Sequence, residues 1–558
     1  NETRQDEGCI NLVMRQGNQI LFPGFAGGLG WKDHAKDRFN NWSDGYAITT
    51  NAITRFGGLL NGLKEVVDMT GIAAGYRVIK QIKHNDVNIR ITWNGTNSRV
   101  YREESGAWAL KETVSSARAW DIVSFHDGTN SILAVAYGAD TAFRYSVNDG
   151  SAWTASTFSG TADNPKFFLN QQNNLTGPRV LWCVDPNELY FAPSLVNGTT
   201  ISTSSTVGGA DAQDDFNCLI QNNIGVVYLG KRHYLYAYAN GPSVVVAGPF
   251  NDPPADAGGQ SDRDNFENPQ VMANGWIIFQ VEGYDLIAIR DREIRLGQAP
   301  RATPEMNGWN LPRLDLPINA MQVVGNNLIV ALGIGDPSNK RSVVSRAGAA
   351  NLLQNTFVST SELYSGIIDA SGNLIWHGSE LTCTDLIRGF AYDENDGYLY
   401  MFSGASESAD LQATRCFYFL SGQEITLSSS NLQMNVTNPA ILETAVVGST
   451  NPFNREVWEY LKCMTTMLAS AVPSLRVDYR IVPEHDTSSA YTVLETYADE
   501  QRALNGTAIP RTATSTVGRL QFRLTADSSS TPDRFGVLRS AELILGDFAE
   551  RRIPAAAM

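Results

Sequence analysis

The sequence predicts an all-β protein: an extended N-terminal arm at residues 1–71, a β-propeller at 72–434, and a C-terminal antiparallel β-sandwich with a tail at 435–558. Three observations predict this fold class. Turns rich in Asn, Asp and Gly join short apolar segments, and a strand–turn–strand unit recurs about every 50 residues. Near the C-terminus, apolar and charged residues alternate strictly, as in strands with one wet face.

The composition limits the classes of function. Of 558 residues, 43% are hydrophobic and only 18% are charged, so the chain has enough apolar material for a large core and is not disordered. The net charge of −15 makes bulk nucleic acid or an anionic membrane an unfavourable partner. The longest apolar stretches, such as 276–279 and 244–247, fall far short of the ~18 residues of a membrane span. We therefore expect a soluble protein.

The N-terminal 71 residues differ from the rest in composition and in the spacing of apolar residues. A Gly-rich stretch at 22–30 and a mixed-charge segment at 31–38 precede apolar residues at helical spacing, namely Ile53, Phe56, Leu60, Leu63 and Val67. Gly57, Gly58 and Gly62 interrupt that pattern, and each costs ~1 kcal/mol in a helix. We expect an arm with at most one short helix, held against something else.

Hairpins and a repeat predict the propeller. Residues 88–93 lead into Asn94-Gly95, residues 142–147 into Asn148-Asp149-Gly150, and residues 392–397 join two apolar strands. Turn centres at Asn222, Asn274, Gly325 and Gly372 are 47 to 52 residues apart, whereas the gap back to Pro186 is 36. A period of ~50 residues suits four-stranded blades, which gives about five to seven of them. A pair of large β-sandwiches is the competing fold.

The C-terminal part has a different pattern. Leu475, Val477, Tyr479 and Ile481 alternate with charged residues, and 520–524 repeat this period of two. We interpret the region as an antiparallel sandwich. Residues 457–468 fit a helix by spacing, although their neighbours favour a strand.

Six cysteines, with no C-x-x-C pair, exclude a zinc ribbon or a redox motif; they are Cys9, Cys183, Cys218, Cys383, Cys416 and Cys463. Buried free thiols are the favoured interpretation, with disulfides as the alternative.

The six histidines form no H-E-x-x-H or H-x-H pattern, and no G-x-S-x-G elbow occurs. The sequence therefore assigns no catalytic, cofactor-binding or metal-ligating residue, and we expect no cofactor.

Other motifs have a structural interpretation beside the chemical one. Residues 225–231 match G-x-x-x-x-G-K, but Arg232 replaces the Ser/Thr that would bind Mg²⁺, and the segment between is strand material. Residues 146–153 resemble the Asp-box turn of sialidases, with Asn148 at the Asp position. The acidic loops 211–215 and 262–267 could hold Ca²⁺, although solvated loops are favoured. A pair of carboxylates contributed by distant blades, as in a glycosidase, remains an alternative.

The aromatic residues also allow two interpretations. The chain has 11 Trp, 20 Tyr and 23 Phe. Packing between blades is favoured, with sugar stacking or a protein interface as the alternative.

Several segments resemble propeller-bearing virion proteins of tailed bacteriophages. These are 518–524 followed by the Thr-Pro segment 530–545, the strand 477–481, Gly230-Lys231 with 234–236, and 265–269. The resemblance covers roughly residues 215–550 and implies a structural virion protein, in the tail as a nozzle or hub component, a tip or a fibre-like appendage. It carries over no catalytic residue.

The expected function is therefore non-enzymatic, by burial of surface between subunits, in a virion assembled in the host cytoplasm. The expected partners are other virion proteins and further copies of the chain, with a host surface glycan or receptor as a further partner. One alternative is a carbohydrate-active propeller at a cell surface, either a glycoside hydrolase of sialidase type or a lectin. Another is a scaffold that binds a cellular protein.

Overall fold

The computed structural model describes the greater part of the chain. The described residues are 19–22, 28–29, 45–56, 59–147, 149–158, 160–171, 179–209, 211–238, 242–252, 264–282, 285–290, 293–298, 318–335, 358–368, 374–403, 413–418, 420, 439–444, 457–466, 474–482, 490–498, 500–509, 519–527 and 537–546.

Seven four-stranded sheets, called blades 1 to 7, make up the larger unit of the described chain. Blade 1 is β7 (Arg77–His84), β8 (Val87–Trp93), β9 (Ser98–Glu104) and β10 (Ala107–Val114), and blade 2 is β11 (Asp121–His126), β12 (Ser131–Ala136), β13 (Arg144–Ser146) and β14 (Thr154–Ala155). Blade 3 is β15 (Phe167–Gln171), β16 (Arg179–Val184), β17 (Glu188–Ala192) and β18 (Ser202–Thr206), and blade 4 is β19 (Cys218–Gln221), β20 (Val227–Gly230), β21 (Leu235–Tyr238) and β22 (Val244–Ala247). Blade 5 is β23 (Gln270–Val271), β24 (Ile277–Val281), β25 (Asp285–Arg290) and β26 (Glu293–Gln298), and blade 6 is β27 (Ile318–Val324), β28 (Asn327–Gly335), β29 (Val358–Ile368) and β30 (Leu374–Thr382). Blade 7 is β31 (Ile387–Asp393), β32 (Tyr398–Ser403), β33 (Thr414–Phe417) and the N-terminal β6 (Val66–Val67).

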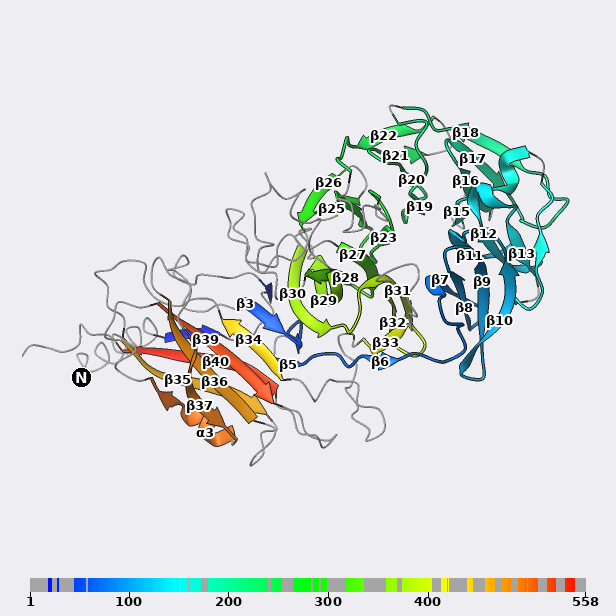
Figure 1. The fold of residues 1–558 in the computed structure, drawn as a ribbon. Helices are drawn as coiled ribbons and strands as arrows, with labels where there is room; N and C mark the ends of the chain where they lie inside the picture. Colours follow the sequence, from blue (N-terminus) through cyan, green and yellow to red (C-terminus); the bar gives the residue numbers. More distant parts are fainter. Residues whose placement is uncertain are drawn as a thin grey trace, which may run out of the picture.

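The blades form a ring, which makes the larger unit a β-propeller (Figure 1). The first strands of neighbouring blades contact each other, β7 with β11, β11 with β15 and β15 with β19, and β31 of the last blade returns to β7. The predicted propeller is thus confirmed. Two short 3₁₀ segments, η2 (Gly138–Asp140) and η3 (Gly160–Asp163), lie in its connections.

The predicted turns explain why the strands begin and end where they do. At the first predicted hairpin, the Asn94 side-chain oxygen accepts hydrogen bonds from the backbone N–H groups of Thr96 and Asn97, at 3.0 and 2.7 Å. The predicted turn before Tyr398 also joins two paired strands, β31 and β32. Asn148 and Gly372 lie outside the described residues.

The uneven spacing of the repeat has a simple cause. The turns at Asn222, Asn274 and Gly325 each join the first two strands of successive blades. Pro186, by contrast, lies between the second and third strands of blade 3. The 36-residue gap therefore compares different hairpins of the blade.

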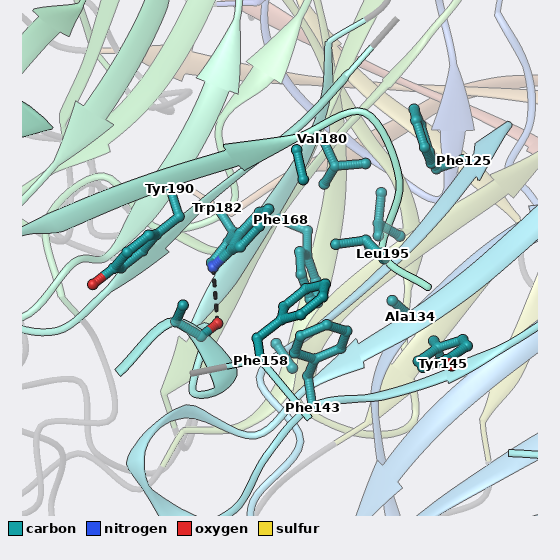
Figure 2. Packing of buried hydrophobic residues seen from close by; sticks show 14 of the residues in the cluster. Phe125, Ala134, Phe143, Tyr145, Phe158, Phe168, Val180, Trp182, Tyr190 and Leu195 are labelled. Carbon is teal, nitrogen blue, oxygen red and sulfur yellow. Dashed lines mark hydrogen bonds between the residues drawn. The ribbon is translucent and has the colours of Figure 1, made fainter. Parts of the chain in front are cut away.

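Each seam between blades has its own apolar core. The seam between blades 2 and 3 contains Trp182, which is fully buried with rings of Phe158 and Tyr190 stacked on it at centroid distances of 6.2 and 6.0 Å (Figure 2). The indole N–H of Trp182 donates to the carbonyl of Ala162 at 3.1 Å, so its polar atom is satisfied. Five further seams bury comparable clusters, and the last one, between blades 7 and 1, is smaller.

A buried ion pair reinforces this smaller seam. Asp68, just after β6, pairs with the fully buried Arg90 of blade 1, while the Asp68 N–H donates to the carbonyl of Ala413 in blade 7. The Arg90 guanidinium also lies 4.0 Å from the ring centroid of Trp108 in blade 1 and 5.1 Å from that of Tyr400 in blade 7. The N-terminal strand therefore both completes the last blade and bonds it to the first.

The smaller unit consists of two sheets that share one core, beside the propeller in Figure 1. One sheet has the order β2 (Gly28–Leu29), β3 (Gly45–Thr50), β34 (Ala440–Thr444), β39 (Arg519–Asp527), β36 (Ser474–Val482) and β37 (Thr492–Tyr497). The other has the order β1 (Gln19–Phe22), β40 (Val537–Gly546), β35 (Val457–Thr466) and β38 (Thr507–Ala508), and helix α3 (Glu500–Asn505) precedes β38. A short ladder of β4 (Ala52–Ile53) and β5 (Leu60–Asn61) leads from this unit to the propeller.

The predicted alternation decides which side chains face this core. Leu475, Val477, Leu520 and Phe522 are buried in it, as the period of two predicts. Asp478, on the face predicted to be wet, is fully buried, because Arg476 at 2.8 Å and Arg523 at 2.7 Å cover its carboxylate. The ambiguous segment 457–468 forms strand β35 over the described residues Val457–Thr466.

The described part of the predicted arm is built differently from the expectation. Residues 19–22, 28–29 and 45–50 add strands to the two C-terminal sheets, and β6 adds one to blade 7. The expected helix is not formed, because the apolar side chains of this segment serve two cores: Ala52 and Leu59 lie in that of the smaller unit, and Leu60 and Leu63 in that between blades 6 and 7. A straight amphipathic helix presents one face and could not supply both.

Candidate functional site: a charged rim on the propeller

The end of the propeller at which the innermost strands begin carries several charged loops. We call this end of blades 1 to 5 the rim. It contains the segments before β7, β11, β15, β19 and β23 and the turns after β8, β12, β16, β20 and β24. These segments converge because every blade runs in the same direction from its first strand.

Cationic and aromatic side chains alternate along the rim of blades 1 to 3. The Arg118 guanidinium carbon lies 5.0 Å from the ring centroid of Trp93 and 4.0 Å from that of Trp120. Arg77 lies 5.4 Å from Trp93, and the Lys166 ammonium lies 4.7 Å from Trp120. We call these five residues the cationic arc. Indole rings attract cations at such distances, which compensates part of the cost of removing three charges from water.

Acidic residues dominate the rim of blades 3 to 5. Lys166 marks the boundary, since its ammonium is 3.1 Å from the Asp185 carboxylate and 3.4 Å from that of Asp215. Burial raises the pKa of Asp185, and Lys166 opposes that shift. Further along, Arg232 binds Asp252 through two hydrogen bonds of 2.8 and 2.6 Å, which lower the pKa of this carboxyl group.

The segment with the phosphate-loop pattern is a blade turn, as its strand-like residues predict. Val227–Gly230 form strand β20, and Lys231 follows with its side chain in the interior. The ammonium donates to the carbonyls of Pro186, Asp211 and Ala212 at 2.7 to 3.2 Å. It therefore ties three rim loops together and is not directed towards a phosphate.

The Asp-box-like segment is also a structural turn. The Gly150 N–H donates to the Ser146 hydroxyl at 3.1 Å, and the Trp153 indole N–H donates to the Gly150 carbonyl at 3.0 Å. The Trp153 ring packs on the core between blades 1 and 2. These bonds close the hairpin and anchor it in the blade, which agrees with the structural interpretation.

The two acidic loops differ in how much of them is described. In loop 211–215, the Asp211 carboxylate accepts hydrogen bonds from the Tyr236 hydroxyl and the His233 backbone N–H. It is therefore engaged by groups of the protein itself. In loop 262–267 only residues 264–267 are described, and Asn265 donates to the carbonyls of Arg232 and Asn251 at 2.7 and 2.9 Å. Among the described residues, no group of three or more His, Cys, Asp or Glu side chains could hold a metal ion.

Five of the six cysteines are described, and all five are free and buried. The interpretation as buried thiols is confirmed for them, while Cys9 lies outside the described residues. Burial raises the pKa of Cys218 and of Cys463 to about 12, so neither is a thiolate at neutral pH.

We predict that these five thiols stay unmodified in the folded protein. A Cys9→Ser variant treated with Ellman's reagent at pH 8 should release almost no colour until denaturant is added, and should then react at all five cysteines. A fast reaction of even one thiol in native buffer would contradict the described burial.

A second group of polar side chains joins the propeller to the smaller unit. Arg55, after β4, reaches Glu380 on β30, with its Nε 2.9 Å from the carboxylate and both side chains at most 2% exposed. The guanidinium also lies 4.4 Å from the ring centroid of Tyr418. Beside this pair, the Leu63 N–H donates to the Glu380 carbonyl at 2.8 Å, and a Cβ atom on Gly62 would lie only 2.5 Å from the same oxygen. Gly62 therefore allows a contact between backbones that no other residue permits. We call this region the junction.

His377 adds a pH-dependent element to the junction. Burial, assisted by the neighbouring Arg55, lowers the pKa of His377 from 6.5 to about 4, and the ring lies 3.4 Å from the Thr54 hydroxyl. Between these pH values the unfolded chain binds more protons than the folded one, so stability rises with pH. The stability that depends on a neutral His377 is fully present above pH 6.5 and is lost as the pH falls towards 4.

We predict that replacing His377 with Phe removes this dependence. The loss of stability between pH 6.5 and pH 4.5 should be smaller in the variant by on the order of 2 kcal/mol, measured by urea denaturation at each pH. Comparing the variant with the wild type cancels other groups, including Glu380, whose pKa is raised by burial. Identical pH profiles would show that His377 titrates normally in the fold.

The sequence contains little signal for either region. The cationic arc is drawn from residues between 77 and 166, and only the short spacing Arg118-Ala119-Trp120 could have indicated a cation beside an indole. Arg55 and Glu380 are 325 residues apart. Of the six histidines, His34 and His485 lie outside the described residues, and His84 bonds Ser124 at 2.8 Å.

No family model and no curated protein matches the chain. Among solved structures, the chain is similar to the extracellular domain of BT4673 from B. thetaiotaomicron (TM-score 0.41, 12% identity), covering 70% of this chain and 47% of that one. It is similar to YCF48 from Cyanidioschyzon merolae (TM-score 0.40, 8% identity, 63% and 98% covered) and to the β-propeller domain of Cps50 (Swd1) from Myceliophteria thermophila (TM-score 0.39, 8% identity, 63% and 99% covered). Likenesses at this level do not bear on function.

In the part of the chain that the structure describes, none of the helices combines the length and hydropathy needed for a bilayer crossing.

Proposed function

We propose that this protein is a non-enzymatic structural component of a tailed-bacteriophage virion, in its tail as a nozzle or hub, a tip or a fibre-like part. In this proposal the larger unit is a seven-bladed propeller, and the smaller one is a β-sandwich that takes strands from both ends of the chain. It acts by burying surface against other virion proteins and further copies of itself, in a particle assembled in the host cytoplasm.

The junction is the observation that carries the proposal. A buried ion pair and a close contact between backbones at Gly62 fix the β4–β5 segment, which connects the two units, to blade 6, and a flexible linker would leave the units free to move. An interface between domains is often polar and mobile. A fixed interface holds the propeller at a defined angle to the smaller unit. A subunit that bears load requires this, whereas a tethered binding module does not.

The segments that resemble virion proteins also have structural roles. Lys231 joins three rim loops of blades 3 and 4, and Asn265 holds the loop that follows blade 4 by bonds to Arg232 and Asn251. Leu475 and Val477 lie in the core of the smaller unit. These residues hold loops and the core of the fold together, which agrees with a structural role.

Labelling of native particles tests the proposal. An antibody raised against the purified chain, coupled to gold, should label purified virions at one fixed position on the tail in negative-stain electron micrographs. Absence of the protein from purified virions would overturn the proposal. Release of reducing sugar from host surface polysaccharide by the purified protein would instead favour the carbohydrate-active alternative.

A further inference from the structure

Charge is divided unevenly over the rim, although the blade 2 part also carries an exposed carboxylate, Asp140, which accepts a hydrogen bond from the Arg118 backbone N–H at 2.9 Å. Blades 1 to 3 present the cationic arc, with Arg118 at its centre between two indole rings. Blades 3 to 5 present Asp214, Asp215, Asp252 and Asp264 on loops of the same rim, which we call the acidic arc. The side chains of Asp215 and Asp252 are 65% and 48% exposed, although Lys166 lies near the first, and Arg232 and His233 lie near the second.

Arg118 is prepared to bind a carboxylate. Its guanidinium is held between Trp93 and Trp120, so little side-chain entropy remains to be lost on binding. Arg118 is only half-buried, so a partner can reach part of it. A planar guanidinium donates in its own plane and matches the two oxygens of a carboxylate, which leaves its faces for contact with aromatic rings.

We propose that the rim is an interface between two copies of this chain, with the cationic arc of each copy on the acidic arc of the other. A two-fold axis in the plane of the rim turns one propeller to face its partner and exchanges the two arcs, so each contact is made twice. Arg118 is the central donor, and Asp215, whose side chain is 65% exposed, is its acceptor.

Charge complementarity favours a second copy over another occupant. The chain as a whole carries −15, so two copies repel each other except where a cationic surface meets an acidic one. The two arcs adjoin on one rim, with Lys166 and its partners Asp185 and Asp215 at the boundary. The chain therefore carries both halves of the contact on one surface. This inference rests on the proposed function, because it names one contact between copies in the assembly.

A charge exchange tests the contact with the full chain. Sedimentation velocity over a range of protein concentrations should show a dimer for the wild type and at least about tenfold weaker association for Arg118→Glu and for Asp215→Arg separately. An equimolar mixture of the two variants should associate again, because the altered Glu then faces the altered Arg while the second contact keeps its native residues. Salt dependence alone is not informative, since salt also relieves the net repulsion.

Glu394→Arg is the matched control, since Glu394 is exposed in the β31–β32 turn at the opposite end of the propeller. It should associate as the wild type does, and circular dichroism should show that all variants are folded. A wild type that stays monomeric, single variants that associate normally, or a mixture that fails to recover would each overturn the interface. Loss of polyglutamate binding in Arg118→Glu with no change in mass would also overturn it, in favour of another acidic partner. These outcomes leave the labelling of virions to decide the proposed function independently.

Discussion

Replacing Glu380 with Ala should cost about 3–5 kcal/mol of stability, since it leaves the Arg55 guanidinium buried without its counter-charge. Both side chains of this pair are at most 2% exposed, so water cannot take the place of the missing carboxylate. Equilibrium urea denaturation followed by tryptophan fluorescence measures the effect as a lower midpoint of the first transition. Cleavage by a protease between β5 and β6 should become faster, because the junction loosens.

Two further variants make this result specific. Glu104→Ala removes a carboxylate from exposed pairs with Arg102 and Lys111 and should change the midpoint little. The double variant Arg55→Met with Glu380→Leu removes both charges and should recover most of the loss, because apolar replacements often stabilise such sites. If Glu380→Ala were no worse than Glu104→Ala, the junction would not depend on the ion pair.

Replacing Asp68 with Ala should have an effect of similar size, about 3–5 kcal/mol, because Arg90 then stays fully buried without its partner. The aromatic rings of Trp108 and Tyr400 compensate only part of that cost. The variant also weakens the attachment of β6, which pairs with blade 7 through only two residues, Val66 and Val67. Hydrogen exchange should therefore speed up first in blade 7 and in residues 66–70.

The location of the exchange distinguishes ring closure from general destabilisation. Glu394→Ala, which alters an exposed carboxylate in the β31–β32 turn of blade 7, is the control and should leave both stability and exchange near the wild type. Uniformly faster exchange in all seven blades of Asp68→Ala would indicate that the ring unfolds as one unit. Faster exchange in blades 3 and 4 alone would contradict the assigned role of Asp68.

Local patterns predicted most of the strands because they follow from nearest-neighbour chemistry. The side chain of Asn94 closes its own turn, and Leu475, Val477 and Phe522 alternate with polar residues because strand side chains point to opposite faces. The sequence also argued against a phosphate site, because Arg232 stands where a Ser or Thr would bind Mg²⁺. The structure agrees, since the Lys231 ammonium donates hydrogen bonds to protein carbonyls.

The segment 53–67 shows where local patterns fail. Its apolar residues have helical spacing, yet Leu59 and Leu60 are neighbours that belong to different cores. The periodicity of one segment cannot predict that its side chains will be buried in two separate cores. The same holds for Gly62, which interrupts a predicted helix but in the fold lies against the backbone of Glu380.

The sequence by itself determined that this is an all-β chain with a propeller repeat and five buried thiols among the described cysteines, since turns, alternation and apolar surroundings are local properties. Only the tertiary structure decided that the N-terminal strand closes the ring through Asp68 and Arg90, that Arg55 joins the two units, and that cations and carboxylates divide one rim. These features bring together residues that lie far apart along the chain, and their partners are selected by burial and charge after the blades have packed.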